Sequence, residues 1–139
     1  MTKVFVYGTL KEGFGNHRVL RDSRKLCDAT IEGFDMISLG AFPGIITGSD
    51  TIYGEVYEVT DTSVMRGLDS LEGHRGNDDP SSMYYKKLCT YKVETKTNEK
   101  TLPNDNEKTG QALVYVYNLK GPYGSNGNLA KVSPARWVR

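Results

Sequence analysis

The sequence contains few of the residues that hold metal ions or form disulfides. Its 139 residues include two cysteines, Cys27 and Cys89, and two histidines, His17 and His74. Neither cysteine belongs to a Cys-x-x-Cys pair, and two histidines with scattered carboxylates make a poor metal set. We therefore expect two reduced, packed thiols, and we expect neither a metal ion nor an organic cofactor.

The sequence also lacks an excess of charge of one sign and long hydrophobic runs. Lysine and arginine total 18 against 17 acidic residues, so the net charge of +1 creates no field that attracts nucleic acid or anionic membranes. No run approaches the ~18 apolar residues of a membrane span, and the first residues do not have the pattern of a secretory signal. We expect a cytoplasmic, monomeric protein without a nucleic-acid or membrane partner.

The residues that are present predict a single domain over residues 1–139. At this length roughly two thirds of the surface of the unfolded chain can be buried, so the core needs no covalent support. Alternating β-branched and aromatic residues predict five strands, at residues 3–7, 29–39, 51–59, 84–93 and 112–117. The alternation is strongest in residues 51–59, which we expect near the centre of the sheet, and residues 40–44 predict a turn.

The clearest predicted helix spans residues 61–73. Its apolar residues at helical spacing are Val64, Met65, Leu68 and Leu71. Asp61 or Thr62 can cap its first turn, and Gly73 can supply the left-handed residue at its end. Residues 17–27 predict either a short helix or a covering loop, and the polar residues 96–110 predict a solvated loop.

Common nucleotide-binding and hydrolase motifs are missing. Gly13-Phe-Gly15 follows a predicted strand, but the third glycine of a dinucleotide site is absent and no Gly-Lys-Ser/Thr occurs. There is no Gly-x-Ser-x-Gly elbow either. A cysteine–histidine dyad stays open on the sequence alone, although no positive feature favours it.

Five short motifs carry the strongest functional signal. They read Val4-Phe-Val-Tyr-Gly-Thr-Leu-Lys11, Asn16-His-Arg-Val-Leu20, Phe42-Pro-Gly44, Gly54-Glu-Val-Tyr57 and Leu68-Asp-Ser-Leu-Glu-Gly73. In these motifs and their order, residues 4–117 resemble the γ-glutamylcyclotransferase-like (AIG2-like) superfamily, and especially its γ-glutamylaminecyclotransferase branch. The resemblance implies an α+β fold, namely a compact mixed β-barrel with short flanking helices.

The resemblance also implies an activity and a set of site residues. Members of the family convert a γ-glutamyl amine or γ-glutamyl amino acid to 5-oxoproline and release the free amine, without a cofactor. Carried onto this sequence, the substrate-binding loop is Tyr7, Gly8, Thr9 and Leu10. The general base, and then acid, is Glu72, and the implied partner is a small γ-glutamyl substrate.

The residues themselves fit this chemistry. The α-amine of the substrate attacks its own γ-carbonyl, so the protein mainly has to fold the substrate and move protons. Glu72 would lie at the negative end of a helix dipole, where partial burial raises its pKa further. A tight turn at Gly8 can direct backbone N–H groups at an anion. Tyr7, with Tyr84 or Tyr85, could line the pocket or donate a hydroxyl hydrogen bond.

Other residues near these motifs have plainer interpretations. We expect Tyr115 and Tyr117 to pack rather than belong to the site. We expect His17 and Arg18 to lie on the solvated surface. Asp69, three residues before Glu72, could lie near the site or on the surface.

Two features depart from the family pattern. Tyr84-Tyr-Lys86-Lys87 has a lysine where members commonly show the arginine of Tyr-x-Arg, so a bidentate grip on a carboxylate would become a point charge. Residues 74–83 are longer than the usual spacer, and we expect them to border the pocket and to select the leaving group.

Two other functions stay open. The same barrel could be a non-catalytic module for a small anion or a partner protein, because a fold does not guarantee activity. Such a module should tolerate replacement of Glu72 by glutamine. A weak RNA-binding protein that uses Lys86, Lys87 and the tyrosines should lose binding steeply with salt.

Overall fold

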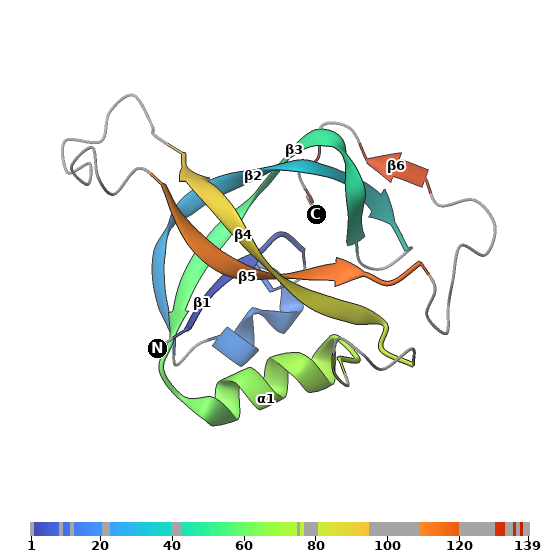
Figure 1. Ribbon diagram of the computed structural model, residues 1–139. Coiled ribbons are helices and arrows are strands. Elements are labelled where there is room, and N and C mark those ends of the chain that lie inside the picture. Colours follow the sequence, from blue (N-terminus) through green and yellow to red (C-terminus); the bar gives the residue numbers. More distant parts are fainter. Residues whose placement is uncertain are drawn as a thin grey trace.

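The structure of the protein is a computed structural model (Figure 1). It describes residues 2–8, 10–11, 13–20, 23–39, 43–74, 76, 81–94, 109–119, 130–132, 135 and 137. The elements are, in chain order, β1 (Thr2–Val6), η1 (Gly15–Leu20), β2 (Arg24–Ser38), β3 (Pro43–Val59), α1 (Thr62–Leu71), β4 (Tyr84–Val93), β5 (Thr109–Tyr117) and β6 (Ala130–Val132).

Five of the strands form a closed, mixed barrel. The order is β3-β1-β5-β4-β2, and a further pairing of β2 with β3 closes the ring. β1 and β5 are parallel, whereas the other neighbouring strands are antiparallel, and β6 adds to β2 outside the ring. α1 lies along the lower side of the barrel in Figure 1. The predicted α+β barrel with short flanking helices is therefore confirmed.

The barrel has two hydrophobic cores because side chains alternate along each strand. Phe5 of β1 and Val114 of β5 belong to the cluster inside the barrel. Their neighbours Val4 and Tyr115 belong to a second cluster, which also contains the buried side of α1. The helix therefore covers the outer face of β1, β5 and the start of β4, and its last turn comes close to the end of the barrel.

The ends of α1 follow the sequence prediction. The side chain of Asp61 accepts a hydrogen bond of 2.8 Å from the backbone N–H of Ser63, and Gly73 has a left-handed φ of 62°. Val64 and Leu68 are buried, as helical spacing predicts. Leu71 is 42% exposed, which corrects its assignment to the buried face, because the helix ends there and runs past the barrel.

β2 and β3 are longer than predicted. Residues 24–27, predicted as part of a short helix or covering loop, pair with the end of β3, and only η1 is helical in that region. Pro43 and Gly44, predicted as a turn, pair with Ser38 and Ile37. Long-range pairing supplies backbone hydrogen bonds that no local pattern reveals. β3 has a strand on each side, but it is not central because a closed barrel has no centre.

The C-terminal third contains two further departures. β5 begins at Thr109, inside the segment predicted as a loop, because Thr109 pairs with Lys92 of β4. β6, which was not predicted, pairs with residues 36–38 of β2. The rest of the predicted loop, residues 96–108, and the predicted turn at residues 40–42 lie outside the described residues.

The two cysteines are free thiols that pack against the interior cluster, as predicted. Burial raises the pKa of both Cys27 and Cys89. In the part of the chain that the structure describes, no helix has the length and apolarity needed to cross a membrane.

Candidate active site

Glu72 is the residue that ends α1. It is the C-cap, and its backbone N–H donates a hydrogen bond of 2.9 Å to the carbonyl of Leu68. Its side chain is partly buried, and desolvation raises its pKa to about 7. Among the residues that the structure describes, no hydrogen bond or ion pair holds the Glu72 carboxylate. The fold therefore presents an unpaired carboxyl group that can gain or lose a proton near neutral pH.

Three buried tyrosines surround Glu72. Tyr7 follows β1, Tyr84 begins β4, and Tyr115 lies on β5. Burial is the main cause that raises the pKa of each hydroxyl, and the negative charge of Glu72 contributes to the rise in all three. The three hydroxyls, which come from the residue after β1, the start of β4 and β5, are therefore close enough to Glu72 to be affected by its charge.

Two of these tyrosines donate their hydroxyl protons to backbone carbonyls. Tyr7 donates to the backbone carbonyl of Tyr115 at 2.6 Å, and Tyr84 donates to the carbonyl of Pro43 at 2.8 Å. A tyrosine hydroxyl has one proton to donate, so each of these oxygens can still accept a hydrogen bond through a lone pair. The structure therefore favours Tyr7 and Tyr84 as acceptors, not as donors to a substrate. Of the two neighbouring tyrosines, Tyr84 is the one affected by the charge of Glu72. Tyr85 packs against the interior cluster.

The loop after β1 turns sharply at Gly8. The backbone N–H of Lys11 donates to the carbonyl of Gly8 at 3.0 Å, and Leu10 is buried. His17 forms a hydrogen bond of 2.9 Å from Nδ1 to the carbonyl of Leu10. His17 is thus partly buried in support of this loop, which corrects its assignment to the solvated surface; Arg18 is exposed, as predicted. Thr9, the remaining predicted loop residue, lies outside the described residues.

Gly8 lies too close to Pro43 for any larger residue. A Cβ atom at position 8 would lie 2.8 Å from Cγ and 2.9 Å from Cδ of Pro43. The proline ring cannot rotate away, and its carbonyl holds the hydroxyl of Tyr84. The turn at Gly8 and Pro43 are therefore in close contact, and this contact sets the distance between the turn and the Tyr84 hydroxyl.

The Gly8→Ala variant should consequently be destabilised by about 1–3 kcal/mol, the usual cost of overpacking. Urea denaturation would measure the loss. Gly67→Ala is a matched control, because a Cβ there meets only Val19 Cγ1 at 3.7 Å and should stabilise α1 by about 0.5–1 kcal/mol. Equal stability of Gly8→Ala and the wild type would show that the contact with Pro43 is not tight.

Asp69 and Tyr115 are members of the site that the sequence prediction left out or left open. The Tyr115 hydroxyl donates to Asp69 Oδ1 at 2.5 Å. Lys86 Nζ lies 3.2 Å from each carboxylate oxygen of Asp69. The signal in the sequence is the alternation on β4 and β5, which places Tyr84 and Lys86 on one face opposite Tyr117 and Tyr115. These residues can be recognised as neighbours only when the register of the two strands is known.

Tyr117 also lies at this end of the barrel. Its ring makes an edge contact with the ring of Tyr84, with 5.7 Å between the centroids. It packs against the second cluster, in agreement with the packing role predicted for it.

The segment after Glu72 is fastened to the start of β4. His74 Nδ1 forms a hydrogen bond of 3.0 Å with the carbonyl of Tyr84, and the N–H of Met83 donates to the carbonyl of Gly73 at 2.9 Å. The His74 ring also makes an edge contact with Tyr115 at 6.2 Å. These described parts of residues 74–83 lie beside the tyrosine cluster, and their role in selecting a leaving group stays a prediction. Residues 75 and 77–80 lie outside the described residues.

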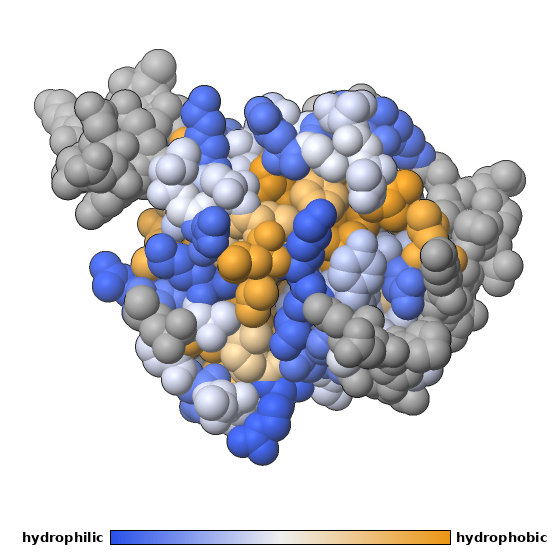
Figure 2. All heavy atoms as spheres, in the orientation of Figure 1, coloured by the Kyte–Doolittle hydropathy of each residue, from blue (hydrophilic) through white to orange (hydrophobic). Residues whose placement is uncertain are grey.

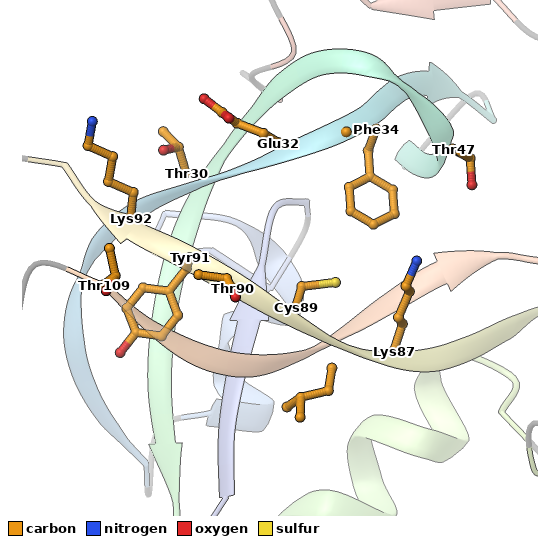
Figure 3. A pocket seen from close by; sticks show the side chains of 12 residues that line it. Thr30, Glu32, Phe34, Thr47, Lys87, Cys89, Thr90, Tyr91, Lys92 and Thr109 are labelled. Carbon is orange, nitrogen blue, oxygen red and sulfur yellow. The ribbon is translucent and has the colours of Figure 1, made fainter.

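A separate cavity of about 600 Å³ opens where β2 and β4 diverge (Figure 3). Figure 3 shows Lys87 and Phe34 pointing toward one another across it, and the Lys87 ammonium lies 5.6 Å from the ring centroid. The face shown in Figure 2 carries hydrophobic residues among hydrophilic ones. Leu88 of β4 is 58% exposed. None of the residues that line this cavity belongs to the cluster around Glu72.

Lys86 and Lys87 point to opposite faces of β4, so they do not form a common basic patch.

The fold and the site together define a small mixed-barrel protein in which the Glu72 carboxylate has no hydrogen-bond or ion-pair partner among the described residues and lies near buried tyrosines. The chain belongs to the family described as "Gamma-glutamyl cyclotransferase, AIG2-like", whose sequence profile matches residues 4–139. The resemblance inferred from the five motifs is thereby confirmed.

Individual relatives agree with this assignment. The chain is 35% identical over 74 residues to the γ-glutamylcyclotransferase family protein YtfP of Escherichia coli. The aligned segment covers 53% of this chain and 65% of that protein. The chain is 37% identical over 86 residues to the γ-glutamylaminecyclotransferase of Rattus norvegicus, covering 52% and 56%. The chain thus spans less than two thirds of the length of these curated relatives.

A solved structure shows the same fold. The crystal structure of an AIG2-like protein from Mus musculus superposes with a TM-score of 0.64 at 27% sequence identity. The superposition covers 88% of this chain and 92% of the mouse protein, so it includes the barrel and α1.

Proposed function

We propose that this protein is a cyclotransferase that converts a γ-glutamyl amine or γ-glutamyl amino acid to 5-oxoproline and the free amine. The observation that carries the proposal is the unpaired Glu72 carboxyl group, whose pKa is raised to about 7 by burial among Tyr7, Tyr84 and Tyr115. A group that titrates near neutral pH can serve both as a base and as an acid within one turnover. Membership of the family supports the same reaction class.

The first step is removal of a proton from the substrate. The α-amine arrives as an ammonium ion, which cannot attack until it loses a proton. The Glu72 carboxylate accepts that proton, while lone pairs on the Tyr7 and Tyr84 hydroxyls can accept the other ammonium hydrogens. The free amine then attacks the γ-carbonyl carbon, and a new C–N bond closes the five-membered ring. Because the nucleophile is part of the substrate, folding the substrate supplies much of the rate enhancement.

The second step is release of the leaving amine. Attack places a negative charge on the former carbonyl oxygen, and backbone N–H groups of the turn at Gly8 are the proposed oxyanion donors. The old amide C–N bond breaks as the tetrahedral intermediate collapses. Glu72 gives its proton to the departing nitrogen, which regenerates the carboxylate. The ring nitrogen loses its second hydrogen to the released amine, so the products are the neutral lactam and an ammonium ion, and no cofactor is needed.

We infer that the leaving group is an amine rather than a large peptide. The rat relative bears the name of an amine cyclotransferase, and the same motifs carry the resemblance to that branch. Lys86, in the place of the usual arginine, is engaged by Asp69 and does not offer a bidentate grip. We therefore propose that the segment between Glu72 and Tyr84 sets selectivity, because its described residues His74 and Met83 lie beside the site.

The test is a panel of γ-glutamyl dipeptides, γ-glutamyl-ε-lysine and simple γ-glutamyl amines, with release of 5-oxoproline followed by mass spectrometry. We expect release from at least one member, with an amine preferred. The N-acetylated form of the best substrate is the matched control, because its blocked α-nitrogen cannot attack. Absence of release from the whole panel by the folded protein would overturn the proposal, and would favour a binding module instead.

A further inference from the structure

Asp69 is the most tightly held carboxylate near the site. It lies on α1, three residues before Glu72, so the two side chains project from neighbouring parts of the last turns. Tyr115 donates to one of its oxygens at 2.5 Å, and Lys86 contacts both oxygens at 3.2 Å. Glu72 has neither kind of partner among the described residues. Of the two carboxylates at this end of the helix, the barrel therefore holds Asp69 with hydrogen bonds and an ion pair, whereas Glu72 has no such partner among the described residues.

The partners of Asp69 come from the two strands under the helix. Lys86 and Tyr115 face one another across the antiparallel pair of β4 and β5. Together they attach the C-terminal end of α1 to the barrel wall by three charge-assisted contacts. Such contacts are roughly twice as strong as neutral hydrogen bonds. The helix end that carries Glu72 is thus fixed against the strands that carry Tyr84 and Tyr115.

Tyr115 also connects both halves of the site. Its hydroxyl binds Asp69 on the helix that presents Glu72, and its backbone carbonyl accepts the hydroxyl of Tyr7, the first residue of the substrate loop. A displacement of α1 relative to β5 would therefore change the distance between Glu72 and Tyr7. Misplacement by about 1 Å can cost up to about 100-fold in rate.

We propose that Asp69, held by Tyr115 and Lys86, is a positioning residue that sets Glu72 against the substrate loop. The inference rests on the proposed cyclotransferase function and goes beyond it, because it assigns a role to three residues that do not transfer protons in that mechanism. It also explains how a lysine can replace the arginine of the family pattern: its task here is to hold Asp69.

The first test is a double-mutant cycle on Asp69→Asn and Tyr115→Phe. Tyr115→Phe keeps the backbone carbonyl that accepts from Tyr7 and removes only the hydroxyl bound to Asp69. We expect each single variant to lose about 10- to 100-fold in kcat with little change in KM, because binding groups stay and the proton-transfer geometry is lost. The double variant should lose no more than the worse single variant, since both changes break one contact.

Ser63→Ala is the matched control for loss of a hydroxyl. Ser63 also donates its hydroxyl to a carboxylate on this helix, Asp61 Oδ1 at 2.8 Å, but at the opposite end of α1 from Glu72. It should keep the kcat of the wild type even if its melting temperature falls. A fall in kcat of the same size in Ser63→Ala would mean that destabilisation of α1, not positioning, explains the loss.

The second test is rescue at position 86. Lys86→Arg should retain most of kcat, since a guanidinium can also hold the Asp69 carboxylate, whereas Lys86→Met should resemble Asp69→Asn. Lys131→Met is the control, because the Lys131 ammonium pairs with Asp35 at 3.8 Å and Asp50 at 3.3 Å and not with Asp69. Wild-type kcat in Asp69→Asn and Lys86→Met would overturn the positioning role. If the wild type itself turns over no substrate, the proposed function has failed instead.

Discussion

The Glu72→Gln variant is expected to lose about 10²- to 10⁴-fold in kcat for the best γ-glutamyl substrate, the usual contribution of general acid–base catalysis. Glutamine has nearly the same shape as glutamate but cannot take a proton from the substrate ammonium ion. KM should change little, because the tyrosines and the loop at Gly8 remain. The measurement is 5-oxoproline release at saturating substrate.

The size of this effect follows from the surroundings of Glu72. Among the described residues, the nearby tyrosine hydroxyls of Tyr7, Tyr84 and Tyr115 donate to a backbone carbonyl or to Asp69, and burial raises the pKa of each. They are therefore poor substitutes for a base near pH 7. Glu32→Gln, an exposed change on β2, should keep full activity as the matched control. Turnover by Glu72→Gln at the wild-type rate would exclude Glu72 as the proton carrier.

Glu72 should also make the protein less stable as the pH rises. The pKa of its carboxyl group is about 7 in the folded protein and 4.5 in the reference state, so the folded chain binds more protons between these values. Stability therefore falls with rising pH across this window, because burial disfavours the charged form. A shift of this size corresponds to at most about 3 kcal/mol above pH 7, and less to the extent that solvent screens the partly exposed group.

Urea denaturation from pH 5 to pH 8 would measure this slope in the wild type and in Glu72→Gln. The variant should lack this component and should be the more stable protein at pH 8. Asp61 does not interfere, because the pKa of that helix-capping carboxyl group is lowered and its contribution disappears only at more acidic pH. Identical pH profiles for the two proteins would contradict a raised pKa at Glu72.

Activity should change in the opposite direction to stability. The base form of Glu72 starts the reaction, so kcat/KM should rise as the pH rises through about 7, where the folded protein begins to lose stability. Deprotonation of Glu72 would then be the common cause of both changes. A profile of kcat/KM that stays flat between pH 5.5 and pH 8 would separate catalysis from Glu72.

The sequence by itself determined the elements whose signals are local. Capping by Asp61 and the left-handed Gly73 depend on residues within a turn of the helix, and both occur as predicted. β4 spans the predicted residues 84–93, a segment rich in the aromatic and β-branched residues that strands favour. The position of Glu72 at the end of α1 also follows from the local pattern. The rise in its pKa, by contrast, is caused by burial and therefore by the tertiary structure.

Tertiary structure alone decided which residues meet. The start of β3 at Pro43, the start of β5 at Thr109 and the addition of β6 depend on partners 5 to 96 positions away. Burial of the Glu72 region brings together Tyr7, Tyr84 and Tyr115 from three strands, and the register of β4 with β5 places Lys86 and Tyr115 around Asp69. A local pattern shows which face a side chain occupies, but only pairing in space determines what that face touches.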